Sequence, residues 1–341
     1  MLNSVVQMAG NRVFPHYYNN LGCLHQIMKK PNLAVYYFKC ALDKLETGEN
    51  SGQSTSWVTQ SQVLYNIGIS LLHARRPSVA FEFLVEVVGA HYLDPHVWYH
   101  LAECIIAHHH RSSGQARETV TQTGVGAGMS HKIVAANPGL EQVESSKTGA
   151  AASLSMEFAY VCLKNAESLL PGVDGKKEKT GVFCEGVGYI GNPVTWSELE
   201  QLRVAIIACK AFTALAVKDY IPAQHYAEQL LQSSSLPSYY SLLGHLYAAE
   251  SLILQDRMGE AMEHLEPEIL SSSWDSVSKT NTGQDWQPNT LDTARQVVQY
   301  NLAVGFALRE DWDKVRHDCS AEMSDSKMYF TGDKSTGSVV Q

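Results

Sequence analysis

Three adjacent histidines, His108, His109 and His110, are the residues of this 341-residue chain that most directly suggest metal chemistry. Imidazole nitrogens bind zinc, and a structural zinc site needs four ligands at tetrahedral positions. Adjacent residues of a helix point in different directions, so such a run supplies at most one or two ligands to one ion. The sequence offers no second histidine or cysteine cluster to complete the set. We therefore interpret the run as a polar helix end and expect no metal site.

Gly186, Gly188 and Gly191 have the spacing GxGxxG, which lets a backbone approach the pyrophosphate of a dinucleotide. That site requires a strand before the first glycine and a helix that opens at the last one. Asn192 and Pro193 follow instead, and the flanking sequence has helical periodicity. We interpret the glycines as loop residues and expect no cofactor, so an enzyme that uses this loop is the least favoured function.

Catalytic motifs of other kinds do not occur in the sequence, which contains no GxSxG, HExxH or P-loop pattern. The acidic residues form no recognisable set for metal-assisted phosphoryl transfer. The seven cysteines are scattered without a CxxC pair, which indicates reduced thiols of the cytosol or nucleus. The sequence therefore predicts a protein without catalytic residues.

The charge and hydropathy of the chain indicate which kinds of partner it binds. The chain has 26 Lys and Arg against 35 Asp and Glu, a net charge of −9, and 45% hydrophobic residues. A phosphate-binding face is normally basic, so we expect no direct nucleic-acid binding. We also expect no membrane segment or secretory signal, because apolar stretches are short and the first ten residues lack a charged start. These features fit a protein that binds other proteins.

An internal repeat predicts the elements that position these residues. The tetratricopeptide pattern places W-x2-L-G-x2-Y on a first helix and Ala-x3-Phe on a second one, within 34 residues. The small residue lets the two helices cross closely, and neighbouring hairpins must stack to bury their apolar faces. Leu101 follows Ile67 by 34 residues, the length of one repeat. The residues expected to pack the repeats are Leu21, Gly22, Ala34, Phe38, Ala41, Ile67, Gly68, Ala80, Leu101, Ala102, Ala159, Leu243, Gly244, Leu302 and Ala303.

Six copies of the pattern predict an all-α tetratricopeptide-repeat solenoid over residues 15–319, after a lead of residues 1–14. The copies lie at about 15–48, 61–94, 95–110 together with 152–171, 194–236, 237–270 and 291–319. Residues 111–151 are rich in Gly, Ser and Thr, so we predict a flexible loop inserted in the third repeat. We further predict loops at 172–193 and 271–290 and a disordered tail at 320–341.

The first helices of such an array line a concave face, which is the natural candidate for partner binding. Asn19, Tyr65, Tyr99 and Tyr300 are the candidates on it, and the three tyrosines each stand two residues before the Leu or Ile of their repeat. Tyrosines suit interfaces because they bury a large area with little loss of entropy. They could equally pack between adjacent repeats.

The stretch from Tyr17 to Leu42, YYNNLGCLHQIMKKPNLAVYYFKCAL, resembles subunit ten of the CCR–NOT mRNA deadenylase complex. Agreement continues more loosely towards Asp318. Members of that family carry further helical repeats before this stretch, so the resemblance implies a partial or alternative form.

The resemblance implies a non-catalytic subunit that pairs with subunit eleven and docks on the central scaffold subunit. It also implies roles in poly(A) shortening, translational repression and microRNA-mediated silencing, in the cytoplasm and the nucleus. A receptor for peptide tails, like the repeats that dock on chaperones, is the alternative. That function needs Lys and Arg beside an Asn, and Asn19, Asn66 and Asn301 recur before the pairs while basic residues are few there.

Overall fold

Helices make up most of the computed structural model, which describes residues 14–49, 59–118, 122–125, 132–135, 154–171, 190, 195–233, 236–266, 270, 288, 290–308 and 310–314. The chain forms two compact units, Met1–Ile206 and Ile207–Gln341. The boundary falls within the long helix α8 (Trp196–Ala216). The fold class predicted from the repeats, an all-α tetratricopeptide-type array, is confirmed. No helix of the described residues is long and apolar enough to cross a membrane.

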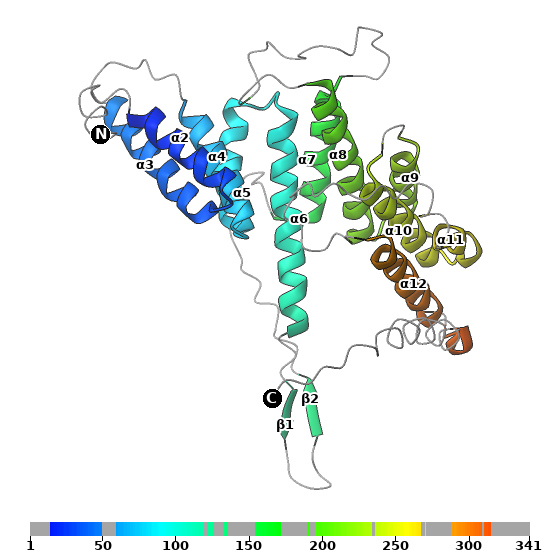
Figure 1. Ribbon diagram of the computed structural model, residues 1–341. Coiled ribbons are helices and arrows are strands. Elements are labelled where there is room, and N and C mark those ends of the chain that lie inside the picture. The colour runs from blue at the N-terminus through cyan, green and yellow to red at the C-terminus, as the bar shows by residue number, and fades with distance from the viewer. Residues whose placement is uncertain are drawn as a thin grey trace, which may run out of the picture. The chain divides into compact units, whose positions relative to one another are not determined.

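Helical hairpins build the first unit (Figure 1). Helix α2 (Phe14–Ile27) packs on α3 (Pro31–Glu49), α4 (Gln60–His73) on α5 (Pro77–Ala90), and α6 (Pro95–Glu118) on α7 (Met156–Leu169). Helix α3 also packs on α4, and α5 on α6, so consecutive hairpins stack on each other. This is the stacking that repeats need in order to bury apolar faces that no hairpin buries alone.

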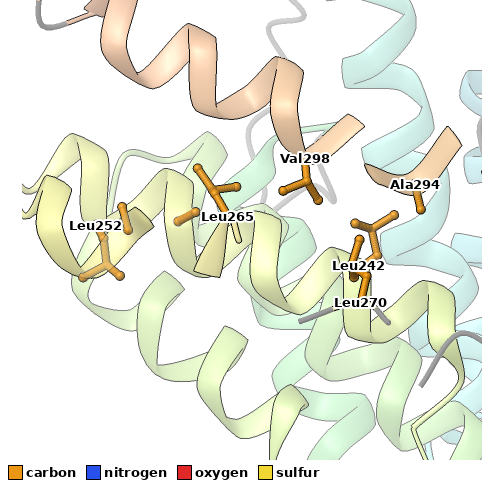
Figure 2. Close-up of a cluster of buried hydrophobic side chains, with 8 residues drawn as sticks. Leu242, Leu252, Leu265, Leu270, Ala294 and Val298 are labelled. Carbon is orange, nitrogen blue, oxygen red and sulfur yellow. The ribbon is translucent and has the colours of Figure 1, made fainter. Parts of the chain in front are cut away.

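The second unit contains α9 (Tyr220–Leu231), α10 (Ser238–Leu254), α11 (Met258–His264) and α12 (Leu291–Leu308). Helix α10 packs on α9, α11 and α12 and so lies at the centre of this unit. Figure 2 shows Ala294 and Val298, on α12, directed at the side chains of α10 and its neighbours. The buried cluster comprises Leu242, Ala249, Leu252, Ala261, Leu265, Leu270, Ala294 and Val298.

Side-chain caps and prolines start several of these helices. Thr59 caps α4 in a capping box, since its Oγ1 accepts from Gln62 N (3.3 Å) and its N–H donates to Gln62 Oε1 (3.0 Å). Thr195 and Glu198 make the same reciprocal pair before α8, at 3.3 and 2.8 Å. Pro77 begins α5, where its missing N–H leaves no bond unmade.

A left-handed residue ends the first helix of five hairpins. In each case its N–H donates to the carbonyl three residues earlier, and the next N–H donates to the carbonyl five residues earlier. This pair of bonds is the Schellman motif, which satisfies carbonyls that the helix leaves open. The five left-handed residues are Lys29, Arg75, Lys218, Asp256 and Glu310, with φ between 56° and 68°.

The turns set the register of the repeats. A small residue lies seven positions before each left-handed residue: Gly22, Gly68, Ala211, Ala249 and Ala303. Twelve positions after the first four of these lies a buried alanine: Ala34, Ala80, Ala223 and Ala261. A Cβ on Gly68 would come within 2.7 Å of Leu84 Cγ, and one on Gly22 would strike the ring of Phe38. The glycines therefore permit the close helix crossing that the repeat pattern predicts.

In the hairpin of α10 and α11, the small residue at the helix crossing is not the one that the sequence suggested. The residue in the position of Gly22 is Ala249, five residues after the Gly244 that the sequence suggested. Gly244 is buried, but a Cβ there would meet Leu231 of α9, at 2.8 Å, and not a residue of α11. The sequence was misleading because a Leu-Gly pair occurs one turn too early on a long first helix.

The insertion predicted as a flexible loop at 111–151 contains regular structure. Helix α6 continues to Glu118, and strands β1 (Gln122–Val125) and β2 (Lys132–Ala135) pair antiparallel, with Gln122 opposite Ala135. The helical extension is polar, so it shows no apolar stripe, and the strands are too short for a recognisable alternation. Arg111 secures the extension by donating from Nη1 to the Arg75 carbonyl (2.7 Å).

Several predicted segments lie mostly outside the described residues. They are residues 1–13 of the lead, the loops 172–193 and 271–290 apart from Ile190, Pro288 and Thr290, and the tail 320–341. Gly186, Gly188 and Gly191 are also outside the described part, so their interpretation as loop residues stays a prediction.

Candidate partner-binding face

The first helices α2 and α4 meet through a row of polar side chains. Asn66 Nδ2 on α4 donates to Asn19 Oδ1 on α2 (3.1 Å), and Ser70 Oγ donates to Gln26 Oε1 (2.9 Å). The Gln26 amide also contacts the ring of His73. Because these bonds join residues more than forty positions apart, they fix how one hairpin lies on the next. Asn19 is therefore in part a packing residue on this face.

Tyr65 and Tyr99 both lie against the ring of His100. The ring of Tyr65 meets it edge-on at 5.9 Å between centroids, and that of Tyr99 at 5.2 Å. His100 Nδ1 is in turn 2.9 Å from Glu103 Oε2. Tyr65 also packs beside the buried cluster of Leu64, Val87 and Val97, and burial raises the pKa of its hydroxyl. Of the two alternatives for this tyrosine, the structure favours packing between repeats.

The face offers little to bind a terminal carboxylate. Helices α2 and α4 contain no Lys or Arg. Asn19 and Asn66 are bonded to each other, so their amides already have a partner. A clamp on a peptide tail uses basic side chains together with such an amide. These contacts disfavour the peptide-tail receptor.

Tyr300 differs from the other two tyrosines because it is 69% exposed. It lies on α12, which packs against α10 in the second unit. Between these helices is a pocket of about 180 Å³. Its lining is mostly apolar and comprises Leu246, Ala249, Glu250, Ile253, Leu254, Leu265, Asn301, Val304 and Gly305. We name this the α10–α12 pocket.

The hydrophobic core of the second unit supports the α10–α12 pocket. Ala249 and Leu265 belong both to the buried cluster of Figure 2 and to the pocket lining. Gly305 lets α12 approach α10, since a Cβ there would lie 2.9 Å from Ile253 Cδ1. The walls are therefore held by close helix packing and are formed before any partner arrives. Sequence reasoning named Tyr300 on this face but not the pocket between the helices.

The structure also reveals two polar residues that the sequence did not single out. Asp94 is 1% exposed; its Oδ1 accepts from the His96 N–H (2.9 Å) and its Oδ2 from the Ile190 N–H (2.8 Å). It thus caps α6 and binds the backbone of Ile190, a residue distant in the sequence. Lys210 is 3% exposed, and its Nζ lies 4.0 Å from the centroid of the Tyr226 ring, a cation–π contact. The one signal for Asp94 in the sequence was its position directly before Pro95, which is typical of a helix cap.

Among the residues that the structure describes, no grouping of side chains suggests catalysis. In the described part of the chain no three His, Cys, Asp or Glu side chains are placed to hold a metal ion. His108 bonds to Ser78 through Nδ1 (3.0 Å), inside α6 and not at its end. Cys104 and Cys162 are buried free thiols, and burial raises the pKa of Cys162 to about 12. Such thiols are protonated at neutral pH and serve as core residues.

The fifteen expected packing residues fall into two groups by burial. Those that are fully buried are Gly22, Ala34, Phe38, Ala41, Ile67, Gly68, Ala80, Leu101, Ala102, Ala159 and Gly244. Those that are half-buried are Leu21, Leu243, Leu302 and Ala303. The second helices are thus the better predicted ones, because their Ala and Phe positions point directly at the first helix.

Comparisons with known proteins found a matching repeat family and several similar proteins. Residues 201–281 match the family described as CNOT10 tetratricopeptide repeat domain. CCR4-NOT transcription complex subunit 10-B of Xenopus laevis is 33% identical, over 88% of this chain and 49% of the relative. Subunit 10 of Danio rerio is 33% identical over 88% of this chain and 60% of the relative, and that of Drosophila melanogaster 29% identical over 86% and 48%.

The chain spans about half the length of most of these curated relatives. The matched family domain covers most of α8 together with α9, α10 and α11. The chain thus resembles CCR4-NOT transcription complex subunit 10 over most of its length.

Proposed function

We propose that this chain is a non-catalytic subunit of the CCR4-NOT complex, and that it holds other protein subunits on its helical hairpins. The observation that carries the proposal is the similarity over 88% of the chain to proteins named as subunit 10 of that complex. The helical-hairpin fold supports it, because stacked repeats present extended surfaces to other proteins. Exposed apolar residues such as Ile27, Ile221 and Tyr300 provide contact area for such partners.

The proposed partners are the central scaffold subunit and subunit eleven of the complex. Through them the chain would support poly(A) shortening, mRNA decay, translational repression, microRNA-mediated silencing and transcription regulation. The proposed locations are the cytoplasm and the nucleus. We propose no nuclease chemistry for the chain itself, since a deadenylase active site needs carboxylates that hold divalent metal ions for in-line displacement.

Affinity purification of the tagged chain from cells, followed by mass spectrometry, tests the assembly. We expect it to recover the scaffold subunit, subunit eleven and the catalytic deadenylases, which the tag alone does not. The purified chain, incubated with polyadenylated RNA and Mg²⁺, should leave the tail intact, while a catalytic subunit shortens it in the same buffer. Recovery of no deadenylase subunit, or metal-dependent shortening by the chain alone, would overturn the proposal.

A further inference from the structure

The α10–α12 pocket is a preformed hollow on the face of successive first helices. Its volume of about 180 Å³ is below the roughly 300–1,000 Å³ of sites for small-molecule ligands. Apolar cavities of roughly 150 Å³ take up a molecule the size of benzene. The pocket therefore has room for one large apolar side chain, and it is too small for a nucleotide or a comparable cofactor.

Apolar groups continue from the pocket on to the surface. Leu254 and Val304, which line it, are 43% and 37% exposed. Tyr300 lies one helical turn before Val304 on α12, so the two side chains occupy neighbouring positions on the helix surface. An exposed tyrosine beside an apolar hollow is typical of interface residues that bury when a partner binds.

Two oxygen-bearing side chains give the pocket its chemical preference. Glu250 is the one acidic residue of α10, a helix without Lys or Arg. No cation of the described residues forms a salt bridge with it, although apolar surroundings raise the pKa of its carboxyl. Asn301 Nδ2 donates to the Val297 carbonyl (2.7 Å), so its Oδ1 is the atom that can accept a further bond. A donor with positive charge complements both groups.

We infer that the α10–α12 pocket receives a leucine- or methionine-sized side chain of a partner protein, flanked by a lysine or arginine that pairs with Glu250. The inference rests on the proposed function, because it names the chemistry by which a subunit of the complex would be held. An acidic peptide or a terminal carboxylate does not fit, since Glu250 repels it. The apolar anchor supplies affinity, and the charge pair selects the partner and its register.

The experiment compares pocket variants with a matched charge reversal elsewhere. Glu250→Lys and Val304→Asp alter the pocket, whereas Glu82→Lys makes the same charge change at an exposed position of α5. Far-UV circular dichroism and thermal melting confirm that each variant is folded. Binding to purified subunit eleven and to the amino-terminal part of the scaffold subunit is then measured by biolayer interferometry. We expect each pocket variant to weaken one of these interactions about ten-fold or more and Glu82→Lys to leave both unchanged.

A photo-crosslinker in place of Tyr300 identifies the segment that lies at the pocket. We expect a segment with Leu or Met beside Lys or Arg, and reversal of that basic residue to Glu should restore binding to Glu250→Lys. Wild-type binding by both pocket variants, or a crosslinked segment without this chemistry, overturns the inference alone. A dimer of this chain that Glu250→Lys dissolves would assign the pocket to a second copy and also overturn it. If the wild-type chain binds no subunit of the complex, the proposed function fails, and the inference fails with it.

Discussion

Left-handed residues at the five hairpin turns are all larger than glycine. Lys218 between α8 and α9 has φ 66°, and its side chain is exposed. An L-residue in this conformation brings its Cβ close to the following carbonyl oxygen, which costs about 1–2 kcal/mol relative to the right-handed form. Glycine lacks the Cβ and is the usual residue at this place in a Schellman motif.

Lys218→Gly should therefore stabilise the second unit, by roughly 1 kcal/mol. Lys218→Ala also removes the charge but keeps the Cβ, so it should give little or no gain. Urea unfolding followed by far-UV circular dichroism measures both. A gain of the same size for alanine would show that the charge, and not the backbone conformation, carries the effect.

Two histidines of the second unit face each other across α10 and α11. His245 on α10 and His264 on α11 have their Nδ1 atoms 3.1 Å apart. Burial, and then the neighbouring His264, lower the pKa of His245 to about 4. Burial also lowers the pKa of His264, against the opposing effect of the carboxylates of Glu228, Glu263 and Glu260.

The stability of this unit should fall as the pH drops from about 6.5 to about 4. In that window the unfolded chain binds protons that the folded histidines do not. The free energy of unfolding is therefore highest above about pH 6.5 and decreases as the pH falls towards about 4. We expect a loss on the order of 2 kcal/mol, because part of the site is open to solvent. His245→Asn should flatten the dependence, whereas His225→Asn, at an exposed position of α9, should not. An unchanged slope in His245→Asn, measured by urea unfolding across this range, contradicts the assignment.

At the scale of the element, the crossing of α4 and α5 depends on the absence of a side chain at Gly68. A Cβ at this position would lie 2.7 Å from Leu84 Cγ, inside a crossing where both residues are buried. Gly89 on α5 has no atom within 4 Å of such a Cβ. The two glycines lie on partner helices of one hairpin and differ in what surrounds them.

Gly68→Ala should lower the stability of the first unit by about 1–3 kcal/mol, since overpacking forces the helices apart. Gly89→Ala, in open space, should raise it by about 0.5–1 kcal/mol through helix propensity. Thermal melting of the two variants gives the comparison. In a Leu84→Ala background the added cost of Gly68→Ala should shrink, because the clashing side chain is gone. A cost that persists there would place its origin outside this contact.

Over the whole molecule, repeat arrays unfold in a graded way, because each hairpin contacts only its neighbours. Leu252 lies in the buried cluster of the second unit, among residues of α10, α11 and α12. Leu252→Ala should destabilise that unit by about 2–5 kcal/mol. Native-state hydrogen exchange should show faster exchange in α10 and α12, while amides of α2 to α5 keep their protection. Equal acceleration in both units would indicate a single cooperative fold.

The periodicity of the sequence predicted most of the hairpins, because the residues that make a hairpin lie within one repeat. Ala34 and Phe38 follow Gly22 closely enough for the pattern to specify their contact. The extension of α6 to Glu118 and the β1–β2 strands escaped prediction, because neither has an apolar stripe. The shift from Gly244 to Ala249 also escaped it, since only the turn at Asp256 defines that register.

The sequence by itself determined the fold class and the resemblance to subunit 10, since both depend on local spacing and on residue identity. The exposure of the candidate partner-binding face was decided by the tertiary structure. Tyr65 and Tyr300 hold the same place in their repeats, yet Tyr65 packs against His100 while Tyr300 is 69% exposed. The pocket near Tyr300 combines Glu250 with Asn301, from helices about fifty residues apart. Repeat spacing specifies which residues share a helix face, but exposure depends on the side chains that the neighbouring helices place against that face.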